Sequence, residues 1–196
     1  MTDSKTDSEA DSIIRIAARG DGVTGDGRHV PLTAPGDRVL SDGTVVLGVH
    51  HAQPPCTHFP ACGGCQLQHL DEESYADFVI ARVVGALAGQ GVTAATVLPP
   101  HLSPPMTRRR ASLRAARAGK RVTIGFAEEG SHRLIDLRMC AVLDPTLFAL
   151  IEPLRSLLAL ILPDKRAAHV KMSVIDQGVD LLLEGVRVEG LAADEG

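Results

Sequence analysis

The sequence predicts an α+β protein, with a small N-terminal β barrel followed by a mixed α/β domain that has antiparallel strands and a four-cysteine loop. Three observations support this fold class. Residues 13–49 hold short apolar stretches broken by turn residues, without helical periodicity. Residues 108–117 alternate between polar and apolar side chains, as a half-buried strand does. Two stretches, 71–91 and 144–163, repeat apolar residues at helical spacing.

The N-terminal segment reads as strands joined by tight turns. Four turn signals lie within about thirty residues, a density typical of a small barrel or meander: Gly20-Asp21-Gly22, Gly25-Asp26-Gly27, Pro35-Gly36-Asp37 and Ser41-Asp42-Gly43. The predicted divisions of the chain are a disordered acidic tail at 1–11, a β domain at 12–50, a cysteine loop at 51–70, a helix and connector at 71–105 and an α/β domain at 106–190.

Asp71 is predicted to cap the first helix, and Gly89 and Gly91 to end it. One face of this helix is apolar: Tyr75, Phe78, Val79, Val83, Ala86 and Leu87. The later elements follow in order. The strand at 108–117 returns through Val122, Ile124 and Phe126, and a further extended stretch is expected at Arg133–Leu137.

The second helix should begin at Asp144-Pro145, an N-cap followed by proline in the first turn. Pro153 should kink this helix and Pro163 should end it. The last predicted element is a hairpin of 170–175 and 179–184, joined by a turn at 176–178.

Composition bounds the class of protein. The chain has 196 residues, 44% of them hydrophobic, which is enough for a core. Its polar, acidic start lacks the features of a secretory signal, and no apolar run is long enough to cross a bilayer. We therefore expect a soluble, cytoplasmic protein with no membrane partner. Thiols stay reduced in that compartment, so four cysteines suggest metal or redox chemistry before disulfides.

The cysteines form the most informative motif. Cys56, Cys62 and Cys65 lie within ten residues, and Cys140 follows seventy-five positions after Cys65. Three thiolates from one loop and one from a distant segment can hold a 4Fe–4S cluster, so the spacing favours this group. Glycines at 63 and 64 would let the backbone approach it closely.

Other interpretations of the cysteines stay open on spacing alone. Structural zinc is the main competitor, although it usually takes its ligands from two short hooks and Cys140 has no neighbouring cysteine or histidine. A redox pair of Cys62 and Cys65 lacks the βαβ context of such motifs. Two alternative functions outside methyl transfer follow from these interpretations of the cysteines. With an iron–sulfur cluster the chain could be a single-cluster electron carrier, and with zinc it could be a zinc-stabilised RNA-binding module.

Basic residues gather after the first helix. Seven lie within fourteen positions, without an acidic residue among them: Arg108, Arg109, Arg110, Arg114, Arg117, Lys120 and Arg121. Strand alternation would place Arg108, Arg110 and Arg114 on one face, where residues two apart are separated by about 6.6 Å. That spacing suits phosphates of a nucleic acid. A solvated strand face balanced by Glu128 and Glu129 explains the same pattern.

The segment Cys56–His69, which reads C-T-H-F-P-A-C-G-G-C-Q-L-Q-H, resembles the cluster motif of the TRAM-domain RNA uracil-C5 methyltransferases. These bacterial enzymes use S-adenosylmethionine to methylate uridines of ribosomal RNA. Arg108–Ala111, Ile124–Phe126 and Ile135–Cys140 fall in the family's order, and the resemblance extends over about residues 13–188.

This resemblance implies several roles. The four cysteines match the family's cluster ligands, residues 13–49 its TRAM barrel in abbreviated form, and the arginine strand its RNA-binding central domain. The helix after Asp71 matches one that joins the catalytic domain. The resemblance thereby implies RNA as the partner, and ribosomal RNA in particular, because that is the family's substrate.

The chain also departs from the family. It holds no strand–glycine loop–helix unit for S-adenosylmethionine, and no cysteine is left to attack the uracil ring. We therefore expect the N-terminal part of the enzyme, inactive alone, with S-adenosylmethionine bound only in an absent catalytic half or in a separate methyltransferase domain.

Overall fold

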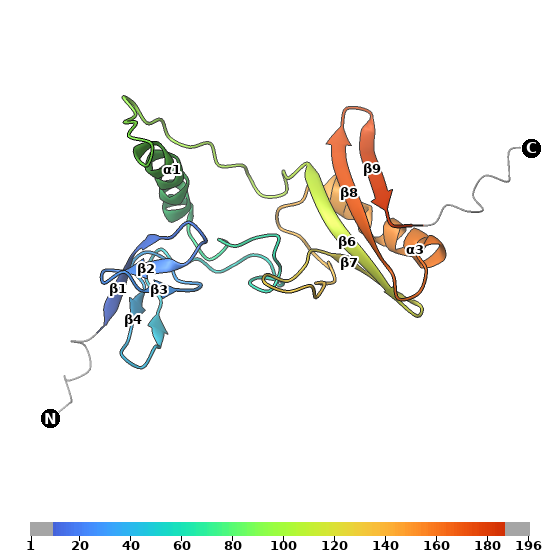
Figure 1. Ribbon diagram of the computed structural model, residues 1–196, viewed down its shortest axis with the longest axis horizontal. Coiled ribbons are helices and arrows are strands. Elements are labelled where there is room, and N and C mark those ends of the chain that lie inside the picture. The colour runs from blue at the N-terminus through green and yellow to red at the C-terminus, as the bar shows by residue number, and fades with distance from the viewer. Residues whose placement is uncertain (1–9, 187–196) are drawn as a thin grey trace, which may run out of the picture. The chain divides into compact units, whose positions relative to one another are not determined.

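A computed structural model describes residues 10–186 (Figure 1). The chain divides into two compact units. Within the described range, unit 1 comprises residues 10–55 and 66–102, and unit 2 comprises residues 56–65 and 103–186. The cysteine loop at 56–65 thus belongs with the C-terminal part of the chain. Most of the predicted acidic tail, residues 1–9, lies outside the described residues, and residue 11 already begins a strand.

Unit 1 contains a five-stranded antiparallel sheet of order β3-β2-β1-β4-β5. Its strands are β1 Asp11–Ile16, β2 Gly22–Thr24, β3 His29–Val30, β4 Arg38–Val39 and β5 Val45–Val46. No pairing joins β3 to β5 within residues 10–186, so the predicted small β barrel takes the form of a curled half-barrel. Its small core contains Ile13, Val23 and Val39. Only strands of two to six residues form, because turns interrupt the chain so often.

Asp37 organises the inside of unit 1. Its carboxylate is fully buried and accepts hydrogen bonds from the backbone N–H groups of Ala34 (2.8 Å) and Gly48 (2.7 Å). The same carboxylate lies 2.7 Å from Nδ1 of His51. A second imidazole, that of His69, is buried beside His51 and lies 3.3 Å from the Thr33 carbonyl oxygen. Polar groups therefore fix the turns that the small core alone would hold weakly.

Acidification is expected to loosen unit 1 through His69. Burial lowers the pKa of His69 below its ordinary value. The unfolded chain therefore binds more protons than the folded chain, and stability falls as the pH drops below about 6.5. The protection factors of the Ala34 and Gly48 amides against hydrogen exchange should fall on acidification in the wild type and much less in His69→Gln. His50 acts in the opposite sense, because Asp71 raises its pKa, so the difference between the two proteins isolates His69. An equal fall of these protection factors in the wild type and in His69→Gln would contradict the role of His69.

Helix α1, Glu72–Ala88, confirms the prediction from the sequence. The Asp71 side chain caps it by accepting the Ser74 N–H at 2.8 Å, and it also contacts Nδ1 of His50 at 2.7 Å. The apolar face of α1 is not packed as its spacing suggested. Ser74 is its one buried residue among those described, whereas Tyr75 is 39% and Val83 59% exposed.

Unit 2 contains a four-stranded antiparallel sheet of order β7-β6-β8-β9 (Figure 1). Its strands are β6 Arg110–Ala118, β7 Arg121–Gly125, β8 Ala167–Ile175 and β9 Gly178–Glu184. The predicted alternation along β6 is confirmed, since Ala111, Leu113 and Ala115 are buried. The predicted hairpin is also confirmed, with Ile175 opposite Gly178 across its turn.

Two helices cover one face of this sheet: α2, Pro145–Ala149, and α3, Ile151–Ile161. Their buried leucines and isoleucines form one core with β6, β7 and β8. Asp144 caps α2 as predicted, by accepting the Thr146 N–H. The helix breaks at Leu150, three residues before Pro153, because a proline ring collides with the carbonyl four residues earlier.

One predicted extended stretch is irregular. Residues 133–137 form no regular strand; Ala127 and Leu134 make an isolated bridge. The chain instead follows the edge of β7 through hydrogen bonds from Ile135 N–H to the Phe126 carbonyl and from Leu137 N–H to the Ile124 carbonyl, both 2.9 Å. Among the described helices, none is long and apolar enough to span a membrane.

Candidate functional site

The cysteine loop is built from consecutive turns. The Phe59 N–H donates to the Cys56 carbonyl at 3.1 Å, the Cys62 N–H to the His58 carbonyl at 2.9 Å, and the Cys65 N–H to the Cys62 carbonyl at 3.4 Å. This winding keeps three thiols close together on a short piece of chain. All four cysteines of the protein are free thiols.

Backbone contacts attach this loop to the segment that follows β7. Cys62 forms an isolated bridge with Glu128, and the Gly63 N–H donates to the Ala127 carbonyl at 3.0 Å. A Cβ at Gly63 would come within 2.7 Å of that carbonyl oxygen. A Cβ at Gly64 would lie 3.0 Å from the Phe126 ring. The two glycines are thus required by close packing of the loop against residues 126–128.

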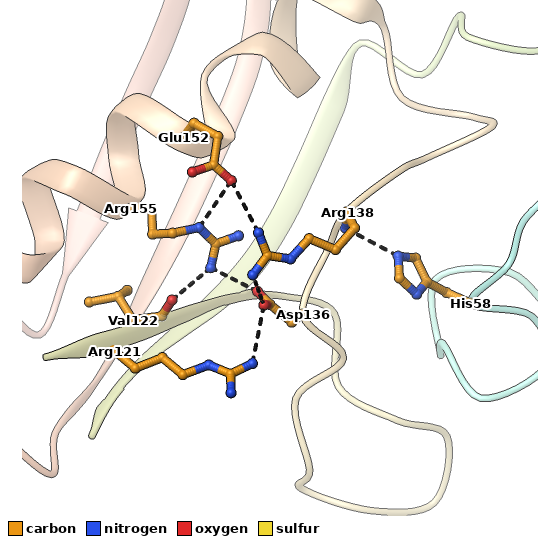
Figure 2. Close-up of polar contacts among 7 residues, drawn as sticks. All are labelled: His58, Arg121, Val122, Asp136, Arg138, Glu152 and Arg155. Atoms are coloured by element: carbon orange, nitrogen blue, oxygen red, sulfur yellow. Dashed lines mark hydrogen bonds and ion pairs between the residues drawn. The ribbon is translucent and has the colours of Figure 1, made fainter. Parts of the chain in front are cut away.

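A second attachment brings the segment of Cys140 to the loop. Nε2 of His58 accepts the backbone N–H of Arg138 at 3.1 Å (Figure 2). Beyond it, the Leu143 N–H points at Sγ of Cys140 at 3.4 Å. The segment that holds the fourth cysteine is thereby attached to the loop, although Cys140 is seventy-five positions from Cys65.

The surroundings of Cys62 shift the pKa of its thiol. Burial raises the pKa of the Cys62 thiol, and a hydrogen bond from the Gly64 backbone lowers it in part. The charges of Cys65, Cys56 and Cys140 each raise the pKa of Cys62 further, so all three lie within electrostatic range of it.

The spacing of the sulfur atoms is wider than a single metal ion requires. Within residues 10–186, no three cysteine Sγ atoms all lie within 4.8 Å of one another. A tetrahedral zinc site with Zn–S bonds of about 2.3 Å separates its sulfurs by only roughly 3.8 Å. The cysteines are therefore not clustered as ligands of one ion.

Asp136 anchors the chain that leads to Cys140 (Figure 2). Its carboxylate accepts hydrogen bonds from Nη1 of Arg155 at 2.8 Å and from Nη2 of Arg138 at 2.7 Å, and Arg121 lies 3.5 Å away. Arg155 also donates to the Val122 carbonyl at 2.6 Å. Burial would raise the pKa of Asp136, but the bonds and charges of Arg155 and then Arg138 hold this pKa below its usual value. The carboxylate joins α3, β7 and the segment before Cys140.

The seven predicted RNA-binding residues divide into two groups. Four bind the protein itself: Arg108 the Gly64 carbonyl, Arg109 the Val174 carbonyl, Arg117 the Gly119 and Leu162 carbonyls, and Arg121 the Asp136 carboxylate. In the part of the chain that the structure describes, no hydrogen bond or ion pair is found for the side chains of Arg110, Arg114 or Lys120. The pattern of charge did not distinguish the two groups, since carbonyl partners are invisible in a sequence.

Sequence reasoning also missed residues that shape this unit. Asp136 and Arg155 carried no signal, because their pairing depends on how α3 packs on β7. The outward orientation of His169 and Lys171 could have been predicted from the sequence. These residues alternate with Ala168 and Val170, which are buried, along β8 and so face away from the core.

A third cluster, in unit 1, has a structural explanation. One ligand atom each of His50, Asp71 and Glu73 lies within 4.8 Å of the others. Asp71, however, already caps α1 and binds His50. The arrangement serves as a clasp at the start of the helix.

Comparison with known proteins gives relatives along most of the chain. It is 44% identical over 183 residues to an uncharacterized RNA methyltransferase of Zymomonas mobilis, an alignment covering 93% of this chain and 46% of the relative. Identity to an uncharacterized RNA methyltransferase of Brucella suis is 36% over 197 residues, covering 94% of this chain and 47% of the relative. No protein-family model matches.

One relative carries a more specific name. The chain is 35% identical over 136 residues to the 23S rRNA (uracil(1939)-C(5))-methyltransferase RlmD of Pectobacterium atrosepticum, covering 67% of this chain and 30% of that protein. The chain spans about half the length of the first two relatives. It is thus a homologue, over most of its length, of proteins named RNA methyltransferases.

Proposed function

We propose that this chain is the RNA-binding and 4Fe–4S-binding part of an RNA uracil-C5 methyltransferase that acts on ribosomal RNA. The observation that supports the proposal is that the four free thiols, at 56, 62, 65 and 140, lie in one unit of a chain homologous to RNA methyltransferases. The similarity to a 23S rRNA uracil methyltransferase supports the substrate class.

Several features of the described residues support an iron–sulfur cluster in this proposal. All four thiols are free, and their sulfurs are spaced more widely than a single ion requires. A cluster of four irons accepts one thiolate on each iron, so its ligands stand further apart than those of zinc. Backbone N–H groups already point at two of the sulfurs, from Gly64 to Cys62 and from Leu143 to Cys140. Such donors compensate the charge of thiolate ligands. The cluster would join the loop to the Cys140 segment as a structural clamp.

The remaining parts of the chain take the family's roles in this proposal. The half-barrel of unit 1 is an abbreviated TRAM-like module, and the open apolar face of α1 is where a catalytic domain would pack. Binding of S-adenosylmethionine and methyl transfer belong to that methyltransferase domain. The part of the work assigned to the described residues is to hold RNA.

Replacing both Arg110 and Arg114 by alanine is expected to weaken binding of a ribosomal RNA fragment. These arginines are free of protein partners in the described structure, so each can neutralise a phosphate. Loss of two contacts should lower the slope of log affinity against log salt by about 1.4 for single-stranded RNA. Arg166→Ala removes the same charge from an exposed loop residue of the same unit and should leave the slope unchanged. An unchanged slope in the double variant would remove both arginines from the RNA site.

A further inference from the structure

One face of the sheet in unit 2 stays open to solvent. Helices α2 and α3 pack on the face that holds Leu113 and Val170. The alternate side chains of β6 and β8 lie on the opposite face, where Arg110 and Lys171 are exposed. A half-covered antiparallel sheet normally carries polar groups on its outer side. The outer side of this sheet is not only polar but also rich in positively charged side chains.

Strand register gathers positive charge on the open face. Across β6 and β8, Ser112 lies opposite Lys171, and Arg114 lies opposite His169. Residues directly opposite in an antiparallel pair project to the same side of the sheet. Arg110 is on this side as well, two residues before Ser112. Neighbouring strands are about 4.8 Å apart and alternate residues about 6.6 Å apart, so three permanent cations occupy one small area.

The positions between these cations carry short side chains. Ser112 lies between Arg110 and Arg114 on β6, and Ser173 lies opposite Arg110 on β8. Hydroxyl groups donate to phosphate oxygens, and short side chains let a backbone approach the sheet. Within the strands of this sheet no phenylalanine, tyrosine or tryptophan is present, so the imidazole of His169 is the one aromatic ring that they place on this face.

Carboxylates bound the face on the β9 side. Glu184 lies opposite His169, and its Oε2 is 2.8 Å from Nζ of Lys171. Asp180 lies opposite Ser173. Both members of the Lys171–Glu184 pair are about half exposed, and such surface pairs are weak, so an anion can compete for the lysine.

We infer that the open face of the β7-β6-β8-β9 sheet binds the sugar–phosphate backbone of single-stranded RNA, with Lys171 and His169 of β8 joining Arg110 and Arg114 of β6. The inference rests on the proposed RNA-binding function and extends its site to a second strand. Arg110 and Arg114 lie four positions apart on β6, about 13 Å, with Lys171 of β8 between them, so the three cations can follow successive phosphates of one strand. Glu184 and Asp180 repel phosphate and confine the strand to the β6–β8 side.

Two charge changes on the same ion pair test this site in opposite directions. In Lys171→Gln, binding of a fluorescein-labelled single-stranded RNA should weaken, with the slope of log affinity against log salt lowered by about 0.7. In Glu184→Gln, binding should tighten, because a negative charge leaves the path of the phosphates while the lysine stays. A change in folding alone would not strengthen binding. Lys165→Gln is the matched control, since it removes an exposed lysine from a loop of the same unit.

The results separate this inference from the function on which it rests. Weaker binding by Lys171→Gln and tighter binding by Glu184→Gln, with Lys165→Gln unchanged, would support it. Wild-type affinity in both variants would overturn the site while the wild-type protein still binds RNA. Absence of RNA binding by the wild type would overturn the proposed function and this inference together. Stronger capture of poly-glutamate than of RNA would overturn it in favour of an acidic protein partner.

Discussion

Changing Cys140 to serine is expected to remove most of the iron from anaerobically purified protein. The wild type should carry about four irons per chain, as a 4Fe–4S cluster requires. Three proposed ligands come from the loop at 56–65, and Cys140 is the one cysteine of its own segment. A serine hydroxyl does not ionise near neutral pH and so replaces a thiolate poorly. Metal analysis and the visible absorbance of the protein measure the loss.

A neighbouring substitution controls for local damage. Ala141→Ser introduces the same hydroxyl one position further along and should retain the wild-type iron content. Full iron in Cys140→Ser would remove this residue from the ligand set. Stoichiometric zinc without iron in the wild type would replace the cluster by a zinc site, and the sulfurs would then have to approach one another more closely than the structure has them.

Arg155→Met should destabilise unit 2 by about 3 kcal/mol, because it removes the donor to Oδ1 of the largely buried Asp136 carboxylate and to the Val122 carbonyl. The Arg155 side chain is only 15% exposed and binds both Asp136 and the Val122 carbonyl. Methionine keeps the aliphatic stem, so the loss of packing is small. Urea denaturation followed by circular dichroism gives the change in free energy of unfolding.

Arg138→Met is the natural comparison, since Arg138 binds the same carboxylate from a position that is 59% exposed. Solvent screens exposed ion pairs, so this change should cost under about 1 kcal/mol. The difference in free energy of unfolding between the two variants measures how much burial strengthens an ion pair with Asp136. Equal losses of stability would show that the burial of Arg155 contributes nothing.

The elements that the sequence predicted well are those fixed by local chemistry. Asp71 and Asp144 cap their helices as expected, because an N-cap depends on residues two or three positions away. The alternation along β6 and the hairpin of β8 and β9 are likewise set by neighbouring residues. Pro153 was expected to kink the second helix, and the helix breaks at Leu150, in the turn before the proline. The sequence predicted a small barrel-like sheet but not that it stays open, since strand pairing across unit 1 is not local.

The candidate site likewise has parts that the sequence predicted and parts that it did not. Spacing singled out the cysteine loop, and the structure brings the Cys140 segment to it through His58 and Arg138. The basic segment was less transparent. Arg117 looks like its neighbours in the sequence, yet it binds the Leu162 carbonyl within unit 2. Which cations face solvent depends on register and on loops from distant parts of the chain, neither of which composition encodes.

The assignment of residues 56–65 to unit 2 has a consequence for how the protein is made. The ribosome delivers this loop early, and Cys140 emerges 75 positions after Cys65. At about 5–20 residues per second, the three early thiols wait roughly 4–15 seconds for the fourth. Within that interval the residues of β6 and β7 are synthesised, but the loop lacks its attachment to Arg138. Closure of unit 2 around its cysteines is therefore a late event of synthesis, and the early thiols depend on a reducing environment until then.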